Sequence, residues 1–161
     1  MSTERKYAKY IIEKTPSPRT HPRPENPKEH GGTNVIYINH ELDGAMPGAP
    51  YLDIALITKP FKPGPFQQHA HSFDEYVVFV GTNIEKPYEL DGLVEFWIED
   101  EKYLLTKTCA VFIPKGVYHC PFVFHEVNSP IVFIATAGAA HNPYPRDPVV
   151  PPPEGYGVPE P

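Results

Sequence analysis

The sequence predicts an all-β domain, an antiparallel β-sandwich or barrel, with a proline-rich arm at each end. Many short segments in the centre of the chain are rich in β-branched and aromatic residues, and turn signals separate them at regular spacing. No part of this centre repeats apolar residues at i, i+3, i+4 and i+7 over about 11 or more positions, as an amphipathic helix does. The sequence therefore allows only short helices, near residues 5–14.

Proline divides the chain into three parts. Of the 22 prolines, five lie in the first 30 residues and eight in the last 19. Proline lacks a backbone N–H and has a fixed φ, so the proline-rich segments 15–32 and 142–161 are excluded from helices and central strands. We expect an N-terminal arm over 1–32, one barrel domain over 33–140 and a C-terminal tail over 141–161. An ordered extended arm needs a surface, which its own barrel or a second subunit would provide, and we expect a homodimer.

Short β-rich segments fill the predicted barrel in order, and turn sequences such as ELDG, IEDE, IPKG and VNSP lie between them. The predicted strands are 34–39, 51–58, 66–71, 75–81, 93–99, 102–108, 109–113, 117–120 and 130–137. The fifth and sixth are expected to form a hairpin around Glu99, Asp100 and Glu101.

Composition limits the partners of the chain. The formal net charge of −6 argues against nucleic acid, which would require a basic face. No apolar run is long enough to cross a membrane, and the charged N-terminus is unlike a signal peptide, so we expect a cytoplasmic protein. No arginine lies between residues 24 and 145, which weighs against a phosphate-rich substrate.

Cys109 and Cys120 are too few for a disulfide framework. A bridge between them would require their strands to pair, and otherwise both are buried thiols.

The central segment HAHSFDE carries two histidines and a glutamate at the spacing of a metal site. Alternate side chains of a strand share a face, so His69 and His71 point the same way, with Cβ atoms roughly 6–7 Å apart. Two imidazoles at this spacing can chelate one ion. A turn over residues 72–74 would bring Glu75 beside them as an oxygen ligand. Taken alone, the pattern also fits an exposed strand with a salt-bridging glutamate.

A second segment, PKGVYH, adds a third histidine. Pro114 and Gly116 make a tight connection between two β-segments, and His119 follows at a position where it can meet the first cluster. A lone histidine in a strand is more often a packed or surface residue. A histidine that follows P-x-G-x-x, downstream of H-x-H-x-x-x-E, favours a ligand instead.

Together these segments resemble the two signature motifs of the cupin superfamily, small antiparallel β-barrels of the jelly-roll type. The first family motif is matched by Gly64, His69, His71, Glu75 and Gly81. The second is matched by Pro114, Gly116 and His119. Val123 stands where the family often has an asparagine, and the leading and closing glycine spacings are each one residue shorter than usual. The resemblance covers about residues 50–138 and leaves the ligand positions intact.

The resemblance implies that His69, His71, Glu75 and His119 bind one divalent metal ion inside the barrel. Three imidazoles and a carboxylate suit first-row ions, among which iron or manganese is favoured and nickel, zinc and copper are alternatives. Octahedral coordination would leave two positions for water, oxygen or a small-molecule substrate. This favours a metal-dependent enzyme that acts on a small oxygen-containing organic molecule, as a dioxygenase or as a Lewis-acid isomerase or lyase. The alternative is a non-catalytic metabolite-binding or sensor barrel.

Several other residues have weaker claims to a role. Gln67 shares strand parity with the histidines and would either point inward or lie at the barrel end, whereas Gln68 would point outward. Asp74 is expected to be a turn residue or cap. His125 shares parity with His119 only if the strand passes Pro121 regularly. The aromatic residues of the centre are expected to pack the barrel or a dimer interface; they are Phe79, Phe96, Trp97, Tyr118 and Phe133. No general acid or base is identified.

Overall fold

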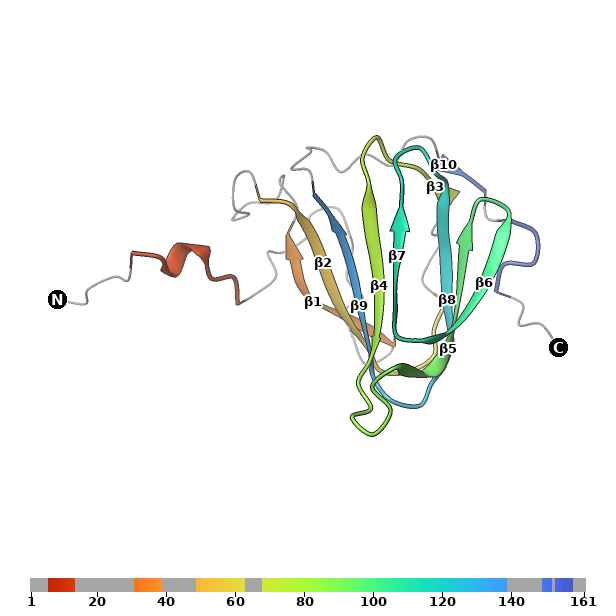
Figure 1. Cartoon of the computed structure of the whole chain (residues 1–161), viewed down its shortest axis with the longest axis horizontal. Coiled ribbons are helices and arrows are strands. Elements are labelled where there is room, and N and C mark those ends of the chain that lie inside the picture. Colours follow the sequence, from red (N-terminus) through yellow and green to blue (C-terminus); the bar gives the residue numbers. More distant parts are fainter. Residues whose placement is uncertain are drawn as a thin grey trace.

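The computed structural model describes residues 6–13, 31–38, 49–62, 68–138, 149–151 and 153–157. These residues form two five-stranded antiparallel sheets that enclose one hydrophobic core (Figure 1). The predicted all-β fold, with antiparallel strands around a single core, is therefore confirmed. Apart from one 3-10 turn, η1 (Ala8–Tyr10), the described residues contain no helix, and this turn falls where the sequence allowed one.

Both sheets are built from strands that lie far apart in the chain. The first sheet has the order β1 (Gly32–Ile38), β2 (Tyr51–Ile57), β9 (Ile131–Ala137), β4 (Glu75–Gly81) and β7 (Cys109–Ile113). The second has the order β10 (Val149–Val150), β3 (Gln68–His69), β8 (His119–Val127), β5 (Glu89–Ile98) and β6 (Glu101–Lys107). Every predicted strand segment contains a strand, and the hairpin is confirmed because Ile98 pairs with Glu101. β10 was not predicted.

Aromatic side chains fill the space between the sheets. Along β4, alternate residues are buried, as expected of a strand with one face on the core. Phe79 lies at the centre of the core, fully buried, with its ring centroid 5.7 Å from that of Phe133 and 5.9 Å from that of Phe96. The predicted packing role of these three rings is confirmed. At the far end of β4, a Cβ on Gly81 would lie 1.9 Å from the Glu89 carbonyl oxygen, so only glycine fits there.

β8 is longer than the sequence predicted. The predicted segment ended at Cys120, just before Pro121, which cannot donate to a ladder, yet the strand continues to Val127. Its pairing with β5 shifts between Phe96, opposite Phe122, and Ile98, opposite His119. Two residues of β8 thus lie opposite one residue of β5, which is a β-bulge. The bulge accommodates the proline, and regular pairing with β5 resumes after it.

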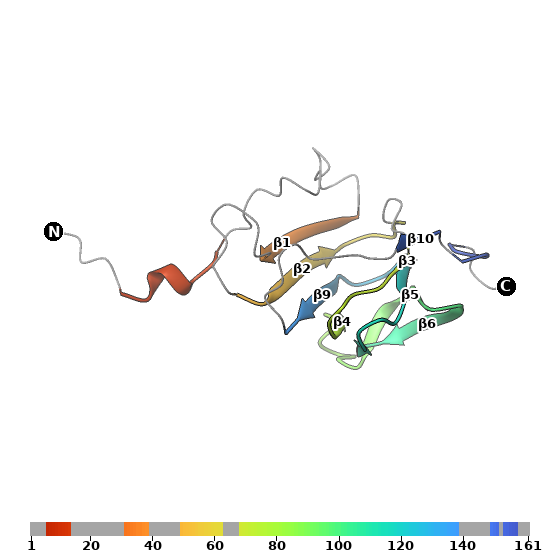
Figure 2. The same ribbon diagram turned by 90° about the horizontal axis from the view of Figure 1, so that it is seen from above.

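The described part of the C-terminal tail, residues 149–151 and 153–157, lies on the second sheet. Val149 pairs with His69 and Val150 with Gln68 (Figure 2). Further along, the Lys62 ammonium lies 3.8 Å from the centroid of the Tyr156 ring. The chain's own barrel therefore provides the surface expected for this arm. Figure 2 shows η1 on the opposite side of the sheets. The homodimer stays a prediction.

A buried carboxylate on the outer face of the second sheet anchors this tail. Glu95 is fully buried; it accepts hydrogen bonds from Trp97 Nε1 at 2.7 Å, His125 Nε2 at 2.7 Å and the Gly157 backbone N–H at 2.8 Å. Burial alone would raise the pKa of Glu95, but the hydrogen bonds from Gly157, Trp97 and His125 outweigh it and lower the pKa below its ordinary value. Burial, followed by the proximity of Glu95 and Cys120, raises the pKa of Tyr156 to about 12.

The two cysteines lie in different sheets. Cys109 begins β7 and Cys120 lies in β8, and both are thiols, as the sequence favoured. Cys120 is buried, whereas Cys109 is only partly buried. Among the described residues, no helix has the length and apolar character needed to cross a membrane.

Candidate metal centre

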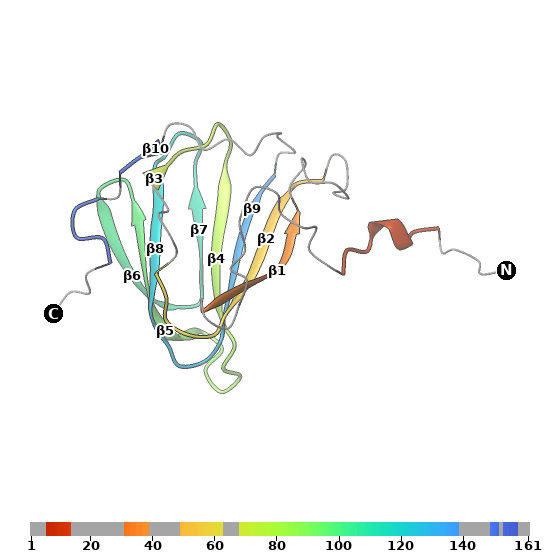
Figure 3. The ribbon, with the colours of Figure 1, turned by 180° about the vertical axis from the view of Figure 1, so that it is seen from behind.

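The four predicted ligands lie at one end of the barrel, where β3 ends and β4 and β8 begin. His69 is the last residue of β3, Glu75 the first of β4 and His119 the first of β8, and His71 lies in the connection between β3 and β4. His69 and His119 are also directly paired across β3 and β8. All four side chains are buried. Figure 3 shows this end of the barrel, with β10 beside β3.

Hydrogen bonds between the two motif loops hold this end together. The Gly116 N–H donates to the His71 carbonyl at 2.8 Å, and the Lys115 N–H donates to Asp74 Oδ1 at 2.9 Å. Gly116 has φ +81°, a conformation that glycine adopts without strain. Asp74 is thus a turn residue that ties one loop to the other, as predicted. The two histidine motifs are placed relative to each other by backbone contacts.

Three of the predicted ligands form one compact group. The donor atoms of His71, Glu75 and His119 lie within 4.8 Å of one another. Glu75 Oε2 lies 2.9 Å from His119 Nε2 and 3.4 Å from His71 Nε2. His119 has 1 % of its surface exposed, and the His71 ring stacks on Phe73 with a 7° angle between planes. Two imidazole nitrogens and one carboxylate oxygen thus converge, and all three side chains are buried.

The hydrogen bonding of His119 fits a cation at this point. Its Nδ1 lies 3.1 Å from the Val117 carbonyl oxygen, which can only accept, so Nδ1 carries a proton. A neutral His119 ring then presents the Nε2 lone pair to Glu75 Oε2, also an electron-pair donor. A proton or a metal ion between them removes the repulsion, and a carbonyl behind the ring is the usual partner of a metal-binding histidine. The residues present therefore fit a metal ion.

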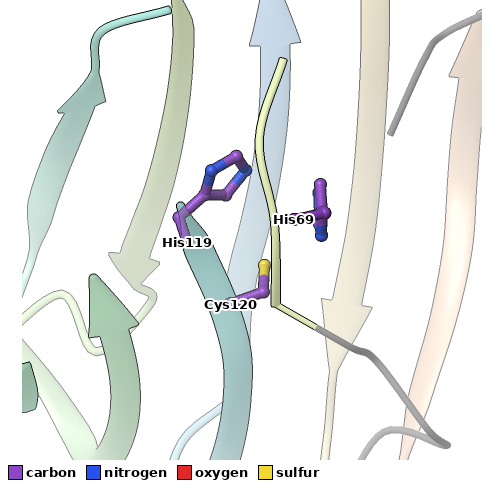
Figure 4. A group of neighbouring side chains, drawn as sticks. All are labelled: His69, His119 and Cys120. Atoms are coloured by element: carbon purple, nitrogen blue, oxygen red, sulfur yellow. The ribbon is translucent and has the colours of Figure 1, made fainter. Parts of the chain in front are cut away.

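His69 lies beside this group and belongs to a second one. Its ring centroid is 4.8 Å from that of His71 and 4.5 Å from that of His119. The donor atoms of His69, His119 and Cys120 also lie within 4.8 Å of one another (Figure 4). The structure thus brings the four predicted residues and Cys120 to one place, as two overlapping triads that share His119. That all four bind a single ion stays a prediction.

Sequence reasoning missed two buried residues at this end. Cys120 was considered only as a thiol or a disulfide partner, and strand alternation would turn the residue after His119 to the opposite face. Gln68 was expected to point outward and was given no role; it is buried, and its side-chain amide donates to the Glu99 carbonyl of the β5–β6 turn. Gly64 and Gln67 lie outside the described residues.

Two other features near the barrel are separate from the candidate centre. His125 contacts Glu95 on the outer face of the sheet, so it is a satisfied structural histidine. A surface hollow is lined by residues that include Glu85, Tyr88 and Asp91. These residues come after the end of β4, whereas Glu75 begins that strand, so the hollow is no part of the candidate site.

Comparison with known proteins gives structural matches at low sequence identity. No protein-family model and no curated protein matches the chain. Among solved structures, the polyketide cyclase RemF from Streptomyces resistomycificus is 16 % identical over 74 % of this chain and 68 % of its own, with a TM-score of 0.43. Peruvianin-I, a cysteine peptidase from Thevetia peruviana latex, is 13 % identical over the same shares, with a TM-score of 0.47.

A third similar structure is hydroxypropylphosphonic acid epoxidase from S. wedmorenis. It is 13 % identical, with a TM-score of 0.38, over 55 % of this chain and 43 % of its own. The chain thus spans less than half the length of that epoxidase. The chemistry of the present chain has to be argued from its own residues.

Proposed function

We propose that this chain is a metal-dependent enzyme of the cupin type that acts on a small oxygen-containing organic molecule. The observation that carries the proposal is the buried convergence of His71, Glu75 and His119, with His69 in ring contact. An ion pair that served only stability would not need two imidazoles beside one carboxylate and a third in contact with both rings. A histidine-rich set with one carboxylate suits iron and manganese, and also accepts nickel, zinc or copper.

The roles of the residues follow from their positions. His69, His71, Glu75 and His119 would hold the ion. When bound, such an ion polarises an oxygen atom of the substrate or supports reaction with O2. The Val117 carbonyl fixes the tautomer and orientation of His119.

The surroundings of these donors support a small, partly apolar substrate. Phe73 stacks on His71 and forms an apolar wall beside the donors, and Phe122 and Phe133 belong to the core in the same barrel. Binding sites for small molecules commonly combine apolar walls with a few placed polar groups. We infer a dioxygenase or a Lewis-acid isomerase or lyase, with the substrate bound through oxygen atoms.

Metal content measured by mass spectrometry on protein purified without a histidine tag tests the proposal. We expect near-stoichiometric iron or manganese in the wild type and its loss in Glu75→Gln, because the amide is a much weaker ligand than the carboxylate. Asp74→Asn is the matched control, because an asparagine oxygen can still accept the Lys115 N–H bond. Its metal content should stay unchanged.

The same experiment can overturn the proposal. Absence of metal under every loading condition would contradict it, and equal metal loss in Asp74→Asn would mean that the carboxylate ligand is misassigned. Oxygen consumption with small aromatic and oxo-acid substrates then separates a dioxygenase from a Lewis-acid enzyme, since only the dioxygenase consumes O2.

A further inference from the structure

The thiol of Cys120 lies at the metal end of the barrel, next to two of the histidines. Its Sγ and one ring nitrogen each of His69 and His119 lie within 4.8 Å of one another, and all three residues are buried. Figure 4 shows the three side chains gathered where β8 begins beside β3. This triad shares only His119 with the group that contains Glu75.

The backbone at the start of β8 explains why both His119 and Cys120 reach this place. Successive side chains of a regular strand point to opposite faces, so a histidine and the cysteine after it would not share a site. Cys120 has φ +65°, in the left-handed region that few residues other than glycine adopt. The bulge between the Phe96–Phe122 and Ile98–His119 pairs falls at the same point. The local conformation therefore turns Sγ towards the histidines.

The donor set has the chemistry of a site for a thiophilic ion. A tetrahedral zinc ion with bonds of about 2.0–2.1 Å to nitrogen and about 2.3 Å to sulfur holds its donors about 3.3–3.6 Å apart. Donor atoms already within 4.8 Å of one another need only small side-chain rotations to reach that spacing. Two imidazoles and one thiolate favour zinc, cobalt(II) or copper(I) over magnesium, calcium or manganese.

We propose that Cys120 is a metal ligand, which together with His69 and His119 gives the centre a sulfur-containing face for thiophilic ions. This inference rests on the proposed metal centre and adds a donor to it. On binding, the thiol loses its proton to solvent and the thiolate sulfur bonds to the ion. The centre then has two donor groups. One contains the oxygen of Glu75, the other contains the sulfur of Cys120, and His119 belongs to both.

Cobalt(II) is the probe, because its visible ligand-field bands report binding, and a near-ultraviolet charge-transfer band reports a cobalt–sulfur bond. The chain has two cysteines, so the full-length Cys109→Ser variant leaves Cys120 as the sole thiol. We expect Cys109→Ser to show both sets of bands, at the intensity of the wild type. Cys120→Ser should keep the visible bands and lose the near-ultraviolet band.

The assignment from Cys109→Ser does not depend on whether Cys120→Ser folds. Visible bands without a near-ultraviolet band in Cys109→Ser would overturn the sulfur ligand and leave the proposed metal centre standing. A near-ultraviolet band that persists in Cys120→Ser and vanishes in Cys109→Ser would also overturn it. No cobalt bands in any variant would overturn the metal centre itself, and the inference with it.

Discussion

Replacing Glu95 with alanine should destabilise the protein and release the C-terminal segment from the second sheet. The Glu95 carboxylate accepts three hydrogen bonds, from Trp97, His125 and Gly157, on a residue that is fully buried. Each hydrogen bond to a charged group contributes about 1.5–3 kcal/mol net. The sum of the three contributions is an upper bound on the lost stability, because the Gly157 and His125 donors form hydrogen bonds with water once the tail leaves the sheet. We therefore expect a loss of about 3–5 kcal/mol in the free energy of unfolding.

Two variants show whether the loss comes from these hydrogen bonds. Glu95→Gln keeps an acceptor for Trp97 and Gly157 and should cost about 1–2 kcal/mol, since it loses mainly the charge assistance. Glu126→Ala removes an exposed carboxylate from the neighbouring strand and should change stability by no more than about 0.5 kcal/mol. Urea unfolding measures all of them, with Trp97, the single tryptophan, as the fluorescent reporter. A cost below about 1 kcal/mol for Glu95→Ala would refute the anchoring role of this carboxylate.

Three further predictions concern the tail, the candidate centre and the core. The lowered pKa of Glu95 means that its contribution to stability is present above the ordinary glutamate value of 4.5 and is lost as the pH falls through the lower folded pKa. Trp97 fluorescence in wild type should therefore hold steady at neutral pH and change in acid, and Glu95→Gln should lack that transition. His71→Ala should abolish or greatly weaken metal binding while circular dichroism shows an intact barrel, because packing holds a domain of this size; global unfolding would make the site structural. Phe79→Ala should cost about 3–5 kcal/mol in urea unfolding, since it opens a cavity among rings that cannot all collapse into it, and a cost below about 1 kcal/mol would contradict the central place of this ring.

The sequence was sufficient to predict the strands because their signals are local. Alternating β-branched and aromatic residues in β4 and β9, and the acidic turn between β5 and β6, each appear within a few positions. The histidine motifs could be recognised for the same reason. A strand fixes the relative directions of His69 and His71 within three positions.

Features that depend on distant contacts could not be predicted. β8 continues past Pro121 because a bulge against β5 takes up the proline, and β10 exists because β3 offers an open edge. The place of Cys120 depends on the same bulge, since strand alternation alone would have turned its thiol away from the neighbouring histidine. The burial of Glu95 depends on a tail that closes over it from far along the chain.

The pairing of Val149 with His69 also bears on the order in which the molecule assembles. These partners are far apart in sequence, and closing a long loop carries an entropic cost that local hairpins such as β5–β6 avoid. We therefore expect the β5–β6 hairpin to form early and the edge beside His69 to order late. In an amide exchange experiment started during refolding, the Val94–Leu105 region should become protected before the amides of β3. The metal end would then be the last part of the barrel to close, after the aromatic core is in place.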